Sequence, residues 1–182
     1  AHANPLPLPP TQKNKDDAEF HYHLGLNYYH GQGDEPNYAK ALNQFKRAAE
    51  LGLPKAKGML GQCYLNGRGI NCDPQKAAFW IKQAASAGDK IAQFTLGIMY
   101  TSGEGIGQNS TLAFRWYLKA AAQGHTAAMA NIGVLYETGQ GVKQNFREAF
   151  RWYEMAAKPG LPTETHRTRS PTFTDDLHMS RD

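Results

Sequence analysis

Glycine recurs every 36 residues along most of this chain. All of the 18 glycines except Gly58 and Gly107 fall in four columns with that spacing. The columns are Gly25, Gly61, Gly97, Gly133; Gly31, Gly67, Gly103, Gly139; Gly33, Gly69, Gly105, Gly141; and Gly52, Gly88, Gly124, Gly160. A fixed period over four units predicts a repeat array, in which neighbouring units stack and bury one continuous core.

Each unit has the spacing of two helices. Ala92, Leu96 and Tyr100 stand at i, i+4 and i+8, on one face of a first helix. Ala113 and Tyr117 begin a similar pattern for a second helix. Tyrosine and alanine keep the 36-residue register at Tyr28, Tyr64, Tyr100, Tyr136 and at Ala41, Ala77, Ala113, Ala149.

The glycine columns mark different points of this helix pair. The first glycine of each Gly-x-Gly suits the left-handed residue that ends a helix, and the second loosens the turn. The column of Gly52 ends the second helix, and Asn37, Asp73, Asn109 and Asn145 stand where a side-chain cap begins it. The column of Gly25 lies inside the first helix, where glycine costs about 1 kcal/mol against alanine. A cost repeated at one position predicts close approach of two helices there.

These motifs resemble the Sel-one-like repeat (SLR), a 36-residue relative of the tetratricopeptide repeat. The resemblance rests on A-x-x-x-L-G-x-x-Y-x-x-G-x-G, a cap, and then K/R-x-A-x-x-W-Y-x-x-A-A-x-x-G. It implies an all-α fold: a right-handed α-solenoid of four antiparallel helix pairs with a concave inner face. The expected repeats are 17–52, 53–88, 89–124 and 125–160, between a Pro-rich leader (1–16) and a polar tail or C-terminal cap (161–182).

The two ends of the array differ. Copy one is divergent, with Phe20 in place of the helix-opening alanine. Copy four carries Phe146, Phe150 and Trp152 and looks like an interior repeat, so its apolar end needs a cover. Three covers stay open: the tail with its Leu161, Phe173, Leu177 and Met179, a second chain that self-associates through this end, or repeats missing from the sequence.

Composition and motifs exclude several function classes. With 41% hydrophobic residues the chain can bury a core, and no apolar run approaches the roughly 18 residues of a membrane helix. A net charge of +4 is too mild and too spread out to indicate nucleic acid. The Gly-x-Gly pairs follow helices and never extend to a phosphate-binding G-x-G-x-x-G. We therefore expect no cofactor, no metal and no catalytic residue, and free thiols at Cys63 and Cys72.

By resemblance to tetratricopeptide arrays, a concave groove is lined by first-helix residues near the core leucine and just past the core tyrosine. The partner-binding candidates are Tyr22, Tyr29, His30, Gln62, Asn66, Phe94, Thr101, Ser102, Glu137 and Thr138. Leu26, Ile98 and Val134 belong to the same face and either line the groove or pack between repeats. Such an aromatic-to-polar surface suits a peptide or short helix with a few apolar anchors.

The predicted function is a non-enzymatic adaptor that holds a protein or peptide in this groove. The alternatives are a binder of a small ligand or cell-wall glycan, an enzyme-associated module, and a fragment of a longer repeat protein. The compartment stays open, because Ala1-His2-Ala3 fits a processed secretion signal, which would favour export, but also an arbitrary boundary.

Overall fold

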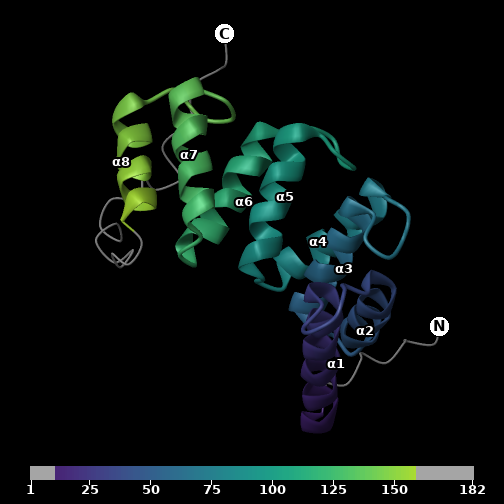
Figure 1. Cartoon of the computed structure of the whole chain (residues 1–182). Helices are drawn as coiled ribbons and strands as arrows, with labels where there is room; N and C mark the ends of the chain where they lie inside the picture. Colours follow the sequence, from purple (N-terminus) through teal and green to yellow (C-terminus); the bar gives the residue numbers. More distant parts are fainter. Residues whose placement is uncertain (1–10, 159–182) are drawn as a thin grey trace, which may run out of the picture.

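A computed structural model describes residues 11–158, and it contains eight helices and no strand in that range. They are α1 Gln12–His30, α2 Tyr38–Glu50, α3 Pro54–Asn66, α4 Pro74–Ser86, α5 Lys90–Ser102, α6 Ser110–Ala122, α7 Thr126–Thr138 and α8 Phe146–Ala157. Odd- and even-numbered helices pair within each repeat, and the four pairs stack in chain order (Figure 1). The predicted all-α solenoid of four helix pairs is confirmed.

The helix ends follow the sequence signals. Asn37, Asp73, Asn109 and Asn145 each accept a backbone N–H and so cap α2, α4, α6 and α8. The first glycine of each Gly-x-Gly ends the first helix in the left-handed conformation, as at Gly103 with φ 81°. α1 differs from expectation, because it begins at Gln12, within the range assigned to the leader. Thr11 makes this early start favourable, since its side chain accepts from the Asn14 backbone N–H.

Glycine inside each first helix lets the two helices of a repeat touch. A Cβ on Gly97 would lie 2.5 Å from a ring carbon of Tyr117, which is buried on α6. Gly25, Gly61 and Gly133 face Phe45, Ile81 and Tyr153 in the same way. The close helix approach predicted from the glycine register is confirmed.

The second glycine of Gly-x-Gly does more than loosen a turn. A Cβ on Gly105 would overlap the carbonyl oxygen of Pro74, at the start of the second helix one repeat earlier. Gly69 and Gly141 lie in the same way against the starts of α2 and α6. This glycine therefore allows successive repeats to approach backbone to backbone.

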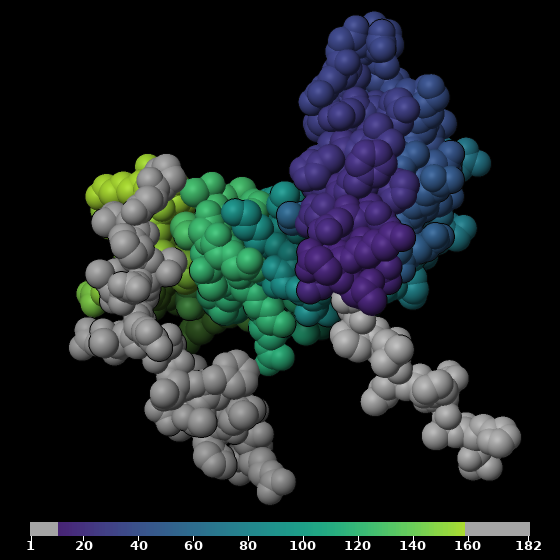
Figure 2. Space-filling model, turned by 90° about the horizontal axis from the view of Figure 1, so that it is seen from below, coloured from purple at the N-terminus to yellow at the C-terminus, as the bar shows by residue number. Residues whose placement is uncertain are grey.

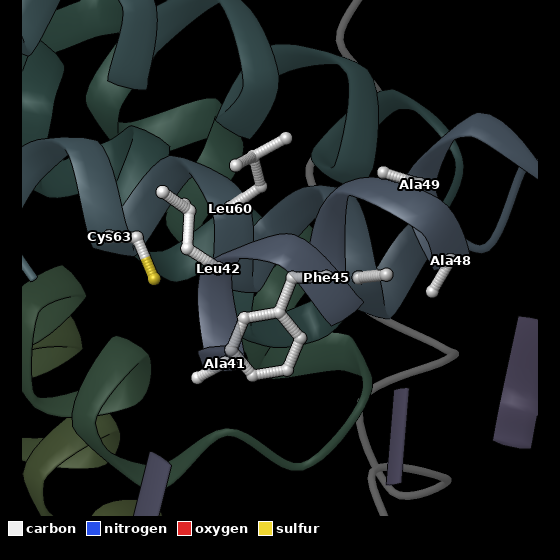
Figure 3. Close-up of a cluster of buried hydrophobic side chains, with 8 residues drawn as sticks. Ala41, Leu42, Phe45, Ala48, Ala49, Leu60 and Cys63 are labelled. Atoms are coloured by element: carbon white, nitrogen blue, oxygen red, sulfur yellow. The ribbon is translucent and has the colours of Figure 1, made fainter. Parts of the chain in front are cut away.

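The core consists of three clusters, each spread over two repeats. In the first, side chains of α2 meet Leu60 and Cys63 of α3 (Figure 3). Each tryptophan packs toward the preceding repeat. The cluster that it contacts is formed by the second helix of that repeat and the first helix of its own, as for Trp80, Trp116 and Trp152. In copy one the equivalent residue is Gln44, whose Oε1 lies 2.7 Å from Nδ1 of His21.

The leader up to residue 10 and the tail from residue 159 lie outside the described residues, as do the tail side chains expected to cap the array. Among the described helices, none is long and apolar enough to cross a membrane. Figure 2 shows the first repeat (purple) at one end of the array and the last (yellow-green) at the other.

Candidate functional site

A cleft of about 750 Å³ opens on the first-helix side of the array. We call it the first-helix cleft. Tyr22 and Leu26 of α1 form part of its wall, and Ile91 comes from the start of α5. The remaining lining residues are His23, Leu53, Pro54, Lys55, Ala87, Gly88, Asp89, Lys90 and Gln123. The cleft thus lies between α1 and the starts of α3 and α5.

Tyr22 is the predicted binding residue that lines this cleft. Its ring is half-buried and packs on Phe45 with centroids 6.1 Å apart. The Lys55 ammonium lies 5.9 Å from the Tyr22 ring centroid and 3.7 Å from a Glu19 carboxylate oxygen. Burial, followed by the Asp89 and Glu19 carboxylates, raises the pKa of the Tyr22 hydroxyl. Tyr22 is therefore a neutral, partly apolar wall.

Leu26, Ile98 and Val134 share one column of the first helices, and we call them the aliphatic row. Ile98 is 40% exposed and Val134 45%, whereas Leu26 is half-buried against the first core cluster. Copy two has Gln62 in this column, also half-buried. These residues were expected either to line the groove or to pack between repeats, and they differ in this respect. Ile98 and Val134 face solvent, whereas Leu26 both packs and lines the cleft.

Tyr29, Thr101 and Glu137 form another column of the predicted groove, and each contacts the second helix of its own repeat. Tyr29 packs on Phe45 with centroids 6.1 Å apart. The Thr101 hydroxyl lies 3.1 Å from the Tyr117 hydroxyl. These contacts tie the two helices of a repeat together.

The Tyr153 hydroxyl makes the corresponding bond in copy four. It donates to Glu137 Oε2 at 2.6 Å, and this bond raises the pKa of Tyr153 to about 12. Glu137 is the one carboxylate among the predicted groove residues, and it already has this partner. Ordinary glycoside hydrolysis uses a pair of carboxylates. The predicted groove residues do not supply such a pair.

Phe94 lies between helices of successive repeats. Its ring stacks on His125 with centroids 4.3 Å apart and touches Tyr117 at 5.9 Å. His125 caps α7 by accepting the Ala128 backbone N–H at Nδ1. The structure thus gives Phe94 packing contacts in addition to its half-exposed face.

We expect His125 to make the stability of the array depend on pH. Burial, followed by the Lys90 ammonium, lowers the pKa of His125 below its ordinary value of 6.5. Stability from the neutral ring is therefore present above pH 6.5 and is lost as the pH falls through the lowered pKa. His125→Asp copies the Asp89 cap of α5. We expect the urea unfolding midpoint of this variant to fall less between pH 7.5 and pH 5 than the midpoint of the wild type. The same change of midpoint with pH in both proteins would contradict this role.

The remaining predicted residues form an exposed polar rim at the ends of the first helices. These residues are His30, Asn66, Ser102 and Thr138. Asn66 Nδ2 donates to the Gln62 carbonyl at 3.0 Å, and Thr138 Oγ1 donates to the Val134 carbonyl at 2.8 Å. Their outer surfaces remain accessible to a partner.

Arg68 joins copies one and two, and the sequence reasoning missed it. It lies between the two glycines of Gly67-Arg68-Gly69, where the other copies have Gln32, Glu104 and Gln140. Its guanidinium donates to the Tyr29 hydroxyl and lies 5.0 Å from the Tyr29 ring centroid. A cation at this variable position was the signal that could have identified the contact.

No group of His, Cys, Asp or Glu side chains within residues 11–158 is arranged to hold a metal ion. Cys63 is buried, and burial raises the pKa of its thiol to about 11, so this thiol is protonated and unreactive at neutral pH. Cys72 is exposed, and its Sγ lies 3.2 Å from the Leu65 carbonyl.

Comparison with known proteins agrees with this architecture. The family model of the Sel1 repeat matches residues 18–53, 54–89, 90–125 and 126–160. The chain belongs to the Sel1 repeat family. Proteins of this family are generally non-catalytic scaffolds for protein–protein interaction. Among proteins with a curated function, no sequence matches.

Solved structures include Sel1 relatives with the same fold. The protective antigen c5321 of uropathogenic Escherichia coli, with an SLR fold, is 35% identical over 77% of this chain, with a TM-score of 0.74. A Sel1 repeat protein from Oxalobacter formigenes is 32% identical over 85%, with a TM-score of 0.76. This chain spans 30% and 62% of those two proteins. Helicobacter pylori cysteine rich protein B (24% identity over 64% of this chain and 92% of its own, TM-score 0.52) shares the fold.

Proposed function

We propose that this Sel1 array binds a peptide segment of a partner protein along the aliphatic row and in the first-helix cleft, without catalysis of its own. The observation that carries the proposal is the exposure of Ile91 and Ile98 on α5 and of Val134 on α7, which are 50%, 40% and 45% exposed. Other first-helix columns are buried in the core, as at Leu60, Leu96 and Ile132. Exposed branched side chains in a row, beside a cleft, favour binding of an apolar ligand.

The lining of the cleft favours an apolar main anchor on the bound peptide. Tyr22, Leu26 and Leu53 offer an apolar wall for one large side chain. Lys90 stands at the same cleft, beside Lys55, which pairs with Glu19 at 3.7 Å. The Asp89 carboxylate at this cleft is engaged in capping α5 through the Ala92 N–H at 2.7 Å. We therefore expect a peptide with a large apolar anchor next to an acidic residue. The polar rim supplies hydrogen-bonding groups at the edge of this surface.

Panning the full chain with displayed random peptides tests the proposal. We expect selected peptides to share an apolar anchor with a neighbouring Asp or Glu. The triple variant Ile91→Ser, Ile98→Ser, Val134→Ser should weaken their binding at least ten-fold, about 1.4 kcal/mol. The variant should remain folded with at most a modest loss of thermal stability, because each of the three side chains is about half exposed.

Phe79 supplies the matched control. It is 58% exposed on α4 and belongs to neither the aliphatic row nor the cleft. Phe79→Ser should leave peptide affinity unchanged. Selected peptides without a common anchor, or peptides that bind the triple variant as well as wild type, would refute the groove assignment.

A further inference from the structure

Gln93 and Gln123 form a hydrogen-bonded pair at the first-helix cleft. Gln123 lines the cleft just after the end of α6, and Gln93 lies near the start of α5. Gln93 is only 5% exposed, and no other side chain with an amide or a charge is buried within residues 11–158. Burial of an amide costs free energy unless its donors and acceptors are bonded.

The hydrogen bonds of this pair fix the orientation of both amides. Gln93 Nε2 donates to the Ala85 carbonyl at 3.1 Å, so Gln93 Oε1 is the end that accepts. Gln123 Nε2 donates to Gln93 Oε1 and to the Gly88 carbonyl, each at 2.9 Å. The opposite orientation of the Gln123 amide would place its oxygen against these two acceptors. The two bonds therefore engage both amide hydrogens of Gln123.

The oxygen of the same amide is unused. Gln123 Oε1 has no hydrogen-bond partner in the part of the chain that the structure describes. Gln123 is exposed and lines the cleft, so this oxygen is accessible to a ligand there. Because the amide is already held in place, it loses little further conformational freedom when it accepts a bond. A neutral oxygen of this kind suits a neutral donor such as a peptide N–H.

The glutamine pair occurs in copy three alone. The positions equivalent to Gln93 in the other copies are His21, Lys57 and Met129, and those equivalent to Gln123 are Leu51, Ala87 and Pro159. Met129 is 6% exposed, so an apolar side chain fills the buried position of copy four without any such pair. The packing of a repeat therefore does not require the two glutamines, and the place where they differ from the other copies is the cleft.

We propose that Gln123 binds the main chain of the peptide in the first-helix cleft, and that Gln93 is its positioning residue. This inference rests on the proposed function and specifies how the same site recognises its ligand. Gln123 Oε1 accepts a hydrogen bond from a backbone N–H next to the apolar anchor that contacts Tyr22 and Leu26. Every residue except proline has this N–H, so the bond fixes the register of the peptide and leaves its side chains free to vary.

Replacement of single peptide amides by esters tests this bond. The probe is the tightest-binding peptide selected by panning the full chain with displayed random peptides. It is fluorescently labelled, and each backbone N–H is replaced in turn by an ester oxygen. Titration with the full chain, followed by anisotropy, should show one ester position that weakens binding at least about five-fold.

Variants of the chain connect that position to the glutamine pair. Gln123→Met should weaken binding of the all-amide peptide by a similar factor, and the ester should then weaken it less than about two-fold further. Gln93→Met, which copies Met129, should also reduce the effect of the ester, because the Gln123 amide is then held by Gly88 alone. Gln140→Met is the matched control, since Gln140 is exposed and lies outside the cleft. Urea unfolding checks the fold of each variant, and Gln123→Ala provides a second, shorter substitution.

Three results would overturn the inference. In the first, no ester position has an effect that depends on Gln123. If binding still depends on Ile91, Ile98 and Val134, the proposed function then stands and the glutamine pair is structural only. In the second, panning selects no peptide, which overturns the proposed function and this inference together. In the third, deletion of residues 1–10 or 159–182 strengthens peptide binding ten-fold or more, and the occupant is then that segment.

Discussion

Gly105→Ala is expected to destabilise the array by about 4 kcal/mol. Two costs combine at this residue. Its φ is +69°, where a Cβ costs roughly 1–2 kcal/mol, and that Cβ would overlap the Pro74 carbonyl at the start of α4. Because the overlapped atom belongs to the backbone, relief requires the second and third repeats to move apart. Urea unfolding should show a lower midpoint and a broader transition, since the coupling between neighbouring repeats weakens.

Gly33→Ala separates these two costs. Gly33 stands in the same column with φ +87°, but nothing lies within 4 Å of the Cβ it would gain. We expect this variant to lose about 1–2 kcal/mol of stability, which is the strain of an alanine in the left-handed conformation alone. The difference between the two variants measures the contact between repeats. Equal losses would mean that this contact contributes nothing to stability.

The second glycine of Gly-x-Gly shows where sequence reasoning about the fold stops. The 36-residue register predicted the helix pairs, the caps and the close approach at Gly97. The register predicted only a turn residue at Gly105, because the sequence of one repeat does not show how the next repeat packs against it. The close contact of Gly105 with Pro74, 31 positions earlier, becomes visible only once the distance between stacked repeats is known.

The sequence predicted which residues share one face of the first helices, but not which of their side chains are free to bind a partner. Tyr29 and Ile98 both satisfy the spacing of the predicted groove, yet Tyr29 packs on Phe45 while Ile98 is exposed. Spacing along one helix cannot reveal what the second helix contributes at that level. Ile91 and Lys55 were missed because they lie at helix starts. Their column changes character from copy to copy, through Glu19, Lys55, Ile91 and Ala127, and that variation was the available signal.

Gly97→Ala is expected to lower the free energy of unfolding by about 3 kcal/mol, although alanine favours a helix by about 1 kcal/mol over glycine. The added Cβ would lie 2.5 Å from one Tyr117 ring carbon and 2.6 Å from the next. The ring cannot yield easily, because it is 2% exposed, packs on Phe94 and is held by its hydroxyl near Thr101. Gly107→Ala, with open space around it and no left-handed strain, should change stability by less than about 0.5 kcal/mol.

A double-mutant cycle with Tyr117→Ala tests whether the loss at Gly97 comes from this ring. Tyr117→Ala alone should cost about 3–5 kcal/mol, through lost burial and the cavity it leaves. When both substitutions are present, the new methyl group occupies part of that cavity instead of meeting a ring. The combined loss should therefore fall short of the sum of the single losses by at least about 1.5 kcal/mol. Simple additivity would show that Gly97 is required for a reason other than the approach of α5 to α6.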